Sequence, residues 1–290
     1  MRDQNAPLDV LCAGEALWDL FAPKGTPFAR ARDLRLVPGG AAVNVALHLA
    51  ALGLRAGLAA TVGDDALGQA LVERVGALGV DVTRVTTTPA RTGLCVVERA
   101  GEERRVMCYR APGEQAASLD RLPEAAALLL TGLLPDEAAL AAQARAARRA
   151  RRHRCTVVLD VNARPRMWRG KDPRIADAIL HEADLVRAST DDLQVLGLDL
   201  ERAREKLRKH AVLVVSDGPG PVVALGPFGR IERSPKPLRL VDPTGAGDAL
   251  TAGILAEVHG AGRDGLRSGG IWANALDQGL ALARAHLKKH

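Results

Sequence analysis

The residues best suited to chemistry lie in front of a helical pattern near the end of the chain. In "LVDPTGAGDALTAGILAEV", residues 240–258, Gly245, Ala246 and Gly247 come before an apolar run, and Asp248 falls in its first turn. Backbone N–H groups that converge at a helix N-terminus can bind an anion. A nearby carboxylate can accept a proton from a hydroxyl during group transfer. The pattern indicates either phosphate chemistry or an ordinary capped helix in which Asp248 complements the helix dipole.

A second glycine pair opens another helical pattern in "LVPGGAAVNVALHLAALG". Gly39 and Gly40 leave the backbone bare, so a ligand could approach it closely. Asn44 follows in the first turns and offers both a donor and an acceptor. A tight turn into a helix explains the two glycines equally well, so this stretch alone decides nothing.

Two common phosphate-binding motifs are absent from the sequence. No G-x-x-x-x-G-K-[ST] occurs, which excludes a P-loop. A dinucleotide fingerprint also fails, because Leu250 stands where a third glycine would follow Gly245 and Gly247, and because these glycines lie far from the first strand.

The composition favours a reduced, non-exported protein. The 290 residues are 47% hydrophobic, enough for a sizeable core. Cys12, Cys95, Cys108 and Cys155 are scattered, without C-x-x-C pairs or zinc-ligand spacing, so we expect neither disulfides nor a cysteine metal site. No segment reaches 18 uninterrupted apolar residues and no signal peptide is evident, so we expect no membrane partner and a cytoplasmic location.

A net charge of +6 and the cluster "RAARRARRHR", residues 145–154, raise the question of a nucleic-acid partner. The cluster ends an Ala-rich helical pattern, where cations meet the negative end of the helix dipole. Aromatic residues make up only 2% of the chain, too few for a base-stacking surface. We therefore expect a solvated helix end and no nucleic-acid binding.

Short apolar runs alternate with Ala/Leu-rich helical patterns along most of the chain. This alternation predicts an α/β fold with parallel strands and crossover helices in a single domain, residues 1–290. Two stretches, about 17–38 and 80–110, lack a helical period, and the second holds strand-like runs around a "GE" turn. We predict that both form a small β-layer beside the main sheet, acting as a lid.

These motifs together carry a resemblance. "DPTGAGDALTAG" resembles the C-terminal signature of the ribokinase family, the phosphofructokinase B-type carbohydrate kinases. "PGGAAVNVALHLAALG", followed by "GLAATVGDDALGQ", resembles its N-terminal signature, and the similarity runs over about residues 9–286. The resemblance implies a three-layer α/β/α sandwich with a β-sheet lid, and an enzyme that uses ATP and Mg²⁺, often with a nearby monovalent cation such as K⁺.

The resemblance also assigns roles to single residues. Asp248 would be the catalytic base, with an anion hole at Gly245, Ala246 and Gly247. The sugar contacts would be Asp19, Gly39, Gly40 and Asn44. The nucleotide side would comprise Ser189, Ser216, Gly218 and Asn274, with Asp192 holding Mg²⁺ through water and Asp242 as the candidate for a monovalent cation.

Some positions depart from the family pattern. "STDD" places Ser189 and Asp192 where Asn and Glu are usual, and "SDGPGP" places Pro221 at the last glycine of the nucleotide-side motif. Asp192 is one methylene shorter than Glu, which a water-mediated Mg²⁺ contact tolerates. The nucleotide preference therefore stays open.

The substrate is the least determined feature. "DVNARPRMW" resembles the D-x-N-x-R-x-x-x-W of fructokinases and 2-keto-3-deoxygluconate kinases, and "MCYRAPGEQAA" resembles the Y-x-R lid segment of the latter. Arg164 and Arg110 could pair with a sugar carboxylate, or equally contact nucleotide phosphate or form surface ion pairs. Cys108 stands where a second lid tyrosine often occurs in the keto-acid kinases.

The sequence as a whole predicts an ATP-dependent kinase for a primary hydroxyl of a ketose or keto sugar acid. The alternatives are a nucleoside kinase of the same family and a weakly catalytic sugar-sensing module. Apolar alternation in "LCVVERA", on a layer too thin to cover both of its faces, predicts a homodimer through the lid.

Overall fold

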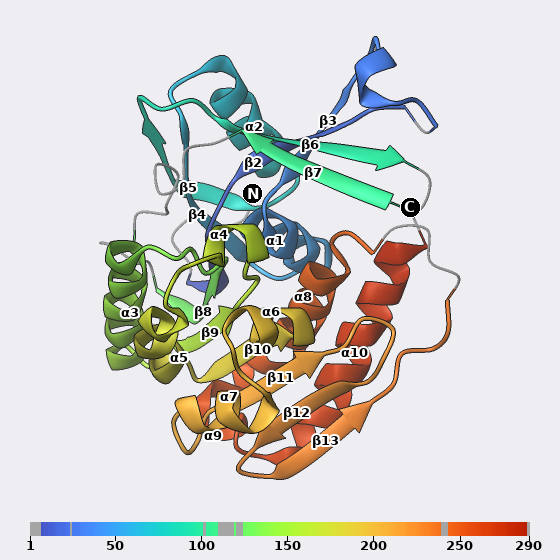
Figure 1. Ribbon diagram of the computed structural model, residues 1–290. Helices are drawn as coiled ribbons and strands as arrows, with labels where there is room; N and C mark the ends of the chain where they lie inside the picture. The colour runs from blue at the N-terminus through green and yellow to red at the C-terminus, as the bar shows by residue number, and fades with distance from the viewer. Residues whose placement is uncertain are drawn as a thin grey trace.

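The computed structural model describes residues 7–23, 25–100, 103–109, 119, 124–238 and 243–288. Two sheets and the helices around them make up this part of the chain (Figure 1).

The larger sheet has nine strands in the order β13-β12-β11-β10-β9-β8-β1-β4-β5. Its strands are β1 (Leu8–Ala13), β4 (Ala56–Gly63), β5 (Asp81–Thr88), β8 (Ala125–Thr131), β9 (Thr156–Asp160), β10 (Leu185–Ser189), β11 (Val212–Ser216), β12 (Val222–Gly226) and β13 (Gly229–Arg233). All pairs are parallel except β11–β12 and β12–β13. The inner strands are continuous apolar runs because both faces of the sheet are covered.

Helices cover both faces, so the predicted three-layer sandwich is confirmed. Alternate strand residues feed the two cores: Ala127 and Leu129 join one, whereas Leu128 and Leu130 join the other. One layer holds α1 (Ala41–Ala51), α2 (Ala66–Ala77), α8 (Ala246–Val258) and α10 (Gly269–Leu287). The other holds α3 (Glu137–Arg152), α5 (Asp177–Glu182), α6 (Thr190–Val195) and α7 (Leu200–Lys206).

Short elements connect these layers, and some boundaries differ from the sequence patterns. The connecting pieces are η1 (Phe28–Arg30), α4 (Pro165–Trp168), η2 (Pro173–Ala176), η3 (His259–Ala261) and α9 (Gly262–Gly265). The helical pattern over residues 264–287 forms two helices, because Ser268 adopts an extended backbone as the N-cap of α10. The β12–β13 hairpin was not foreseen. No helix in the described part of the chain is both long and apolar enough to cross a bilayer.

The smaller sheet is the lid, at the top of Figure 1. It contains β2 (Leu17–Phe21), β3 (Arg35–Gly39), β6 (Gly93–Ala100) and β7 (Glu103–Tyr109), in the order β3-β2-β6-β7. The predicted lid segment 80–110 was too long, because β5 pairs in parallel with β4 and so extends the main sheet. Hydrogen bonds from two parts of the lid tie it to α2 and the turn before it. Asp65, the N-cap of α2, accepts hydrogen bonds from the backbone N–H and the hydroxyl of Thr92, and Trp18 Nε1 donates to Leu67 O at 2.9 Å.

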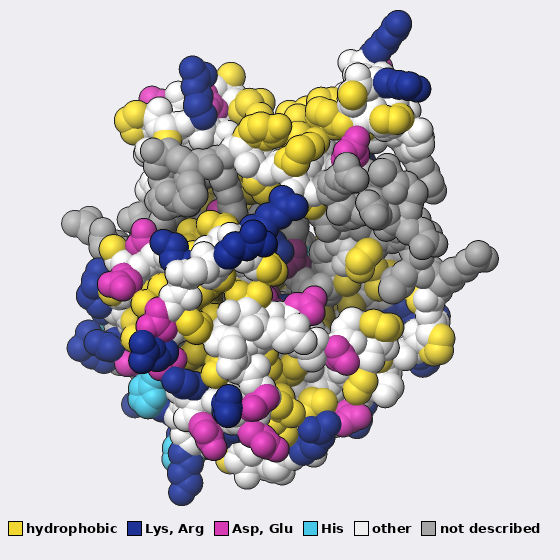
Figure 2. Space-filling view, viewed as in Figure 1, with side chains coloured by type: hydrophobic (Ala, Val, Ile, Leu, Met, Phe, Trp, Pro, Cys, Tyr) yellow, Lys and Arg dark blue, Asp and Glu magenta, His cyan; other side chains and the backbone are white. Residues whose placement is uncertain are grey.

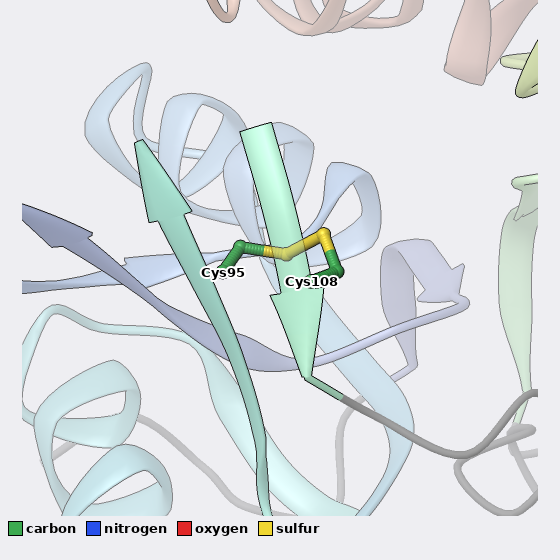
Figure 3. The surroundings of a disulfide bond; sticks show 2 residues. All are labelled: Cys95 and Cys108. Atoms are coloured by element: carbon green, nitrogen blue, oxygen red, sulfur yellow. A yellow bond between two sulfur atoms is a disulfide. The ribbon is translucent and has the colours of Figure 1, made fainter. Parts of the chain in front are cut away.

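A disulfide joins the two lid strands that form a hairpin, which corrects the expectation of four unpaired cysteines. Cys95 on β6 and Cys108 on β7 are register partners, and their sulfur atoms are bonded (Figure 3). Directly opposed residues of an antiparallel pair have closely spaced Cα atoms, here 4.1 Å apart. A separation of 13 residues in the sequence gives no sign of this, because the hairpin register alone brings the two together. Cys12 and Cys155 are free and buried.

Candidate active site

The start of α8 has the geometry that its small residues predict. Gly245 is the N-cap, in the left-handed region at φ 75°. A Cβ there would lie 2.7 Å from His286 Nε2, which itself contacts the Thr244 carbonyl oxygen at 2.8 Å. Glycine is therefore required for both conformation and space. The Ala246 N–H donates to Pro243 O, whereas the Gly247 and Asp248 N–H groups have no acceptor among the described residues, as is usual in the first turn of a helix.

Asn44 and Asp248 meet across 204 residues of sequence. Asn44 lies on α1 and its Nδ2 donates to Asp248 Oδ2 at 2.8 Å. The N-cap of α1, Gly40, has φ 99°, and a Cβ there would lie 2.3 Å from the Glu15 carbonyl oxygen. The second glycine of this pair thus serves a close approach of backbone to backbone, which places α1 and Asn44 against α8.

Asp19, the predicted sugar contact on the lid, lies next to Gly39, the first glycine of the same pair. Asp19, on β2, has its Oδ2 only 2.5 Å from where a Gly39 Cβ would be, so its carboxylate rests over Gly39. Asp19 is the register partner of Cys95, which in turn pairs with Cys108. Neighbouring residues in register project from the same face of a sheet. Asp19 and the disulfide therefore share one face of the lid.

Asp248 is poised to change protonation state near neutral pH. Burial, and after it the nearby Asp160 charge, raise the pKa of Asp248, whereas the Asn44 hydrogen bond and the Arg187 and Arg164 charges lower it, and the net value is about 6. A base whose pKa lies close to the working pH transfers protons efficiently. The side chain combines this basicity with a position beside first-turn amides.

A buried ion pair that sequence reasoning missed lies beneath α8. Arg187 on β10 contacts Asp160 Oδ1 at 3.2 Å and donates to Ser216 Oγ at 3.0 Å, while the Thr251 hydroxyl donates to Asp160 Oδ2 at 2.9 Å. Arg187 Nη2 lies 2.9 Å from where a Gly247 Cβ would be. The guanidinium therefore packs directly against the glycine of the anion pocket. The available signal was a single arginine within the apolar strand "ADLVRAS".

Three of the four predicted nucleotide-side residues lie at the carboxyl ends of neighbouring strands. Ser189 and Ser216 end β10 and β11 and are register partners. Gly218 follows in a turn at φ 50°, with open space around its Cα. Asn274 is exposed on α10. Ligands of open α/β sheets bind at this edge, so the placement suits a nucleotide.

Asp192 has structural partners on both carboxylate oxygens. Its Oδ2 accepts from the backbone N–H and hydroxyl of Ser189 in a capping box, and its Oδ1 accepts from the Ala163 N–H at 2.7 Å. Among the described residues no group of three His, Cys, Asp or Glu could hold a metal. This donor set fits an Mg²⁺ ion carried mainly by phosphates and water, with Asp192 as an outer contact.

Arg164 is exposed at the N-cap of α4, and its charge acts on Asp248. Trp168, four residues later, is buried and its Nε1 donates to Leu133 O at 3.0 Å, which fixes the turn that presents Arg164. The other two predicted site residues, Arg110 and Asp242, lie outside the described residues. Figure 2 shows the surface recessed between the lid and the helices below it.

Comparison with known proteins identifies the family. Residues 8–290 match the pfkB family of carbohydrate kinases, to which the chain belongs. It is 25% identical to the 5-dehydro-2-deoxygluconokinase of Geobacillus thermodenitrificans, over 99% of this chain and 90% of that protein. It is 30% identical to the 2-dehydro-3-deoxygluconokinase of Thermoproteus tenax (91% and 86%) and 31% identical to a fructokinase of Klebsiella pneumoniae (93% and 89%).

A solved structure shares the fold. The fructokinase of Xylella fastidiosa, crystallised with bound ATP, superposes with a TM-score of 0.81 at 24% identity, covering 97% of this chain and 93% of that one. The predicted ribokinase-like fold and the predicted sugar kinase activity are both confirmed. The chain is a carbohydrate kinase.

Proposed function

We propose that this kinase transfers the γ-phosphoryl group of ATP to a primary hydroxyl of a ketose or keto sugar acid, with Asp248 as the base. The observation that supports this proposal most directly is the hydrogen bond from Asn44 to Asp248 at 2.8 Å. It places a basic carboxylate beside both the first-turn amides of α8 and the predicted sugar contacts. The curated relatives named for fructose and for dehydro-deoxygluconates support this substrate class.

The proposed reaction asks the protein mainly for positioning and charge stabilisation. The sugar hydroxyl would donate its proton to Asp248 as its oxygen attacks the γ-phosphorus, and the bond from that phosphorus to the β–γ bridging oxygen of ATP would break. The Gly247 and Asp248 amides, with the Arg187 charge behind them, would stabilise the transferred group. Mg²⁺, held through water by Asp192 and by the phosphates, would neutralise phosphate charge.

A panel of ketoses, keto sugar acids and nucleosides, each with ATP and Mg²⁺ and with coupled detection of ADP, tests the proposal. We expect turnover with a ketose or keto acid. Turnover of nucleosides alone would favour the nucleoside kinase alternative. Sugar binding without any ADP release would contradict the Asp248 assignment and favour a sensing module.

Arg164 offers a way to separate acid from neutral substrates. If a sugar carboxylate pairs with this exposed guanidinium, Arg164→Ala should weaken transition-state binding of a keto acid by about 1.5–3 kcal/mol. A neutral ketose should lose less, as seen in kcat/KM for the two substrates. Equal losses would exclude a carboxylate partner. Arg174→Ala, at an exposed arginine that pairs with Asp172, serves as the control.

For assembly, we propose a homodimer through the lid. Leu36, Met107 and Tyr109 are exposed on it, Tyr109 by 63%, and β7 is an edge strand. Exposed apolar residues at an unpaired edge favour pairing with a second copy. Light scattering should give twice the chain mass at assay concentration, and a monomer would contradict this. We also propose a cytoplasmic location, where ATP is made; there glutathione would have access to the Cys95–Cys108 disulfide.

A further inference from the structure

A second, strongly cationic pocket lies at the opposite edge of the main sheet from Asp248. Its volume is about 640 Å³, within the usual range for small-molecule sites. Its wall includes Asp184, just before β10, and His210 and Ala211, just before β11, so it borders the amino ends of these strands. The candidate active site borders their carboxyl ends. The cationic pocket and the candidate active site are therefore separated by the length of a strand.

The arginine cluster that the sequence analysis interpreted as a helix end contributes to this pocket. Arg151 and Arg154 come from the end of α3, Arg208 from the segment after α7, and Arg263 and Arg267 from α9 and the turn that follows it. Side chains distant in sequence thus converge on one cavity. The lower left of Figure 2, near the ends of these helices, shows dark blue and cyan side chains together.

The cations are not neutralised by the carboxylates around them. Five lining residues are arginines and two, Asp184 and Asp264, are aspartates. Glu182 stands behind the wall and pairs with Arg151 and Arg208 at 3.6 and 3.7 Å. Counting it as well, five arginines face three carboxylates, an excess of two positive charges.

Two of the cations have no carboxylate paired with them in the described part of the chain. Arg263 Nη2 donates only to the Arg151 carbonyl oxygen, at 3.1 Å. Arg154 has no side-chain hydrogen bond or ion pair to any described residue, and its backbone holds φ 60°, where glycine or asparagine is the usual helix-ending residue. Arg154 is exposed and Arg263 is half-buried, so both guanidinium groups are open to a ligand in the pocket.

We propose that this pocket binds a small phosphate monoester. A phosphate monoester carries about −1.5 to −2 charge at pH 7, which matches the excess of two, and arginine forks suit its oxygens. The apolar wall of Ala211, Ala261 and Leu266 would contact the organic part of the molecule. A sugar phosphate and a nucleoside monophosphate share this chemistry, and the test separates them.

Hydrogen–deuterium exchange on the full chain tests the proposal, with fructose 6-phosphate and AMP as separate probes at millimolar concentration. We expect slower exchange in residues 208–212 and 261–267 with one or both probes. Arg154→Ala/Arg263→Ala should raise the dissociation constant about tenfold to a hundredfold, the effect of losing charged hydrogen bonds. Arg174→Ala/Arg202→Ala removes the same charge at exposed ion pairs elsewhere and should leave binding unchanged.

Several outcomes would overturn the proposal. Protection confined to the segments around Ser216 and Asp248 would mean that the probes bind only the candidate active site. Equal weakening by both double variants would mean that general charge attracts the probes. A short RNA retarded in a gel through Arg154 and Arg263, with no protection by either monoester, would assign the cluster to nucleic acid instead.

Discussion

The sandwich and the lid hold their functional residues in different ways. Around Asp248, two groups of hydrogen bonds meet on α8: Asn44 of α1 bonds to Asp248, and Thr251 bonds to the buried Asp160–Arg187 pair of β9 and β10. The lid has four strands, exposed apolar residues on β7, and hydrogen bonds to the sandwich through Trp18 and Thr92. Interior contacts hold catalytic geometry rigidly, whereas a thin layer can adjust. The comparison suggests that the sandwich determines the chemistry and the lid the affinity for substrate.

The largest expected effect comes from changing the sandwich at its reactive group. Asp248→Asn keeps the side-chain volume and can still accept the Asn44 hydrogen bond, but it removes the base. We expect kcat to fall about 10²- to 10⁴-fold, with ATP and sugar still bound. Single-turnover kinetics and titration calorimetry would measure both. Activity within a few-fold of the parent would make Asp248 a structural residue.

The pH dependence of the parent and of Asp248→Asn provides the control for this prediction. The pKa of Asp248 is about 6, so parent kcat should fall about tenfold per pH unit below 6. A raised carboxyl pKa also means that the stability from this group is full below its ordinary value, 3.8, and is lost as pH rises through 6. Asp248→Asn escapes that loss. It should therefore gain stability over the parent between pH 4 and pH 8, as denaturant titrations would show.

The second largest effect should come from the ion pair beneath the anion pocket. Arg187→Met leaves the Asp160 carboxylate buried without its cation, which should cost about 3–5 kcal/mol of unfolding free energy. Because the Arg187 charge also lowers the pKa of Asp248, the acid limb of the kcat profile should move to higher pH. A merely structural role for Arg187 would leave that limb in place.

The double variant Asp160→Asn/Arg187→Met is the matched control for the ion pair. It removes both charges, so it should unfold at a higher denaturant concentration than Arg187→Met alone. If the two variants unfold together, the pairing at 3.2 Å contributes nothing, and the loss comes from packing against Gly247.

The same comparison explains what could be predicted from the sequence. Hydrophobic alternation predicted the parallel strands and crossover helices, and Gly-Ala-Gly-Asp predicted the start of α8, because both are local patterns. The three-layer arrangement was implied by the family resemblance. The Cys95–Cys108 pair, the Arg187–Asp160 pair and the cationic pocket depend on strand register and on helix ends that meet only in three dimensions. Of these, Arg187 gave a local sign as a charge within an apolar strand, and the arginine cluster at residues 145–154 marked only one part of the pocket. The sequence did not place β5 in the nine-stranded sheet, because its parallel pairing with β4 is also nonlocal.

The smallest effect on turnover should come from the lid disulfide, and it tests the proposed division most directly. Cys95→Ser/Cys108→Ser removes a cross-link between β6 and the edge strand β7, which lies on the same face as Asp19. Closing a loop of this size contributes about 3 kcal/mol in the chain-entropy view, so exchange of lid amides should accelerate about tenfold to a hundredfold. Sugar KM should rise a few-fold while kcat stays within about twofold, since the groups around Asp248 lie outside the lid. Dithiothreitol should change the parent in the same direction and leave the double variant unaffected. A fall in kcat as large as that of Asp248→Asn, with KM unchanged, would show that the lid takes part in the chemistry and that the proposed division is wrong.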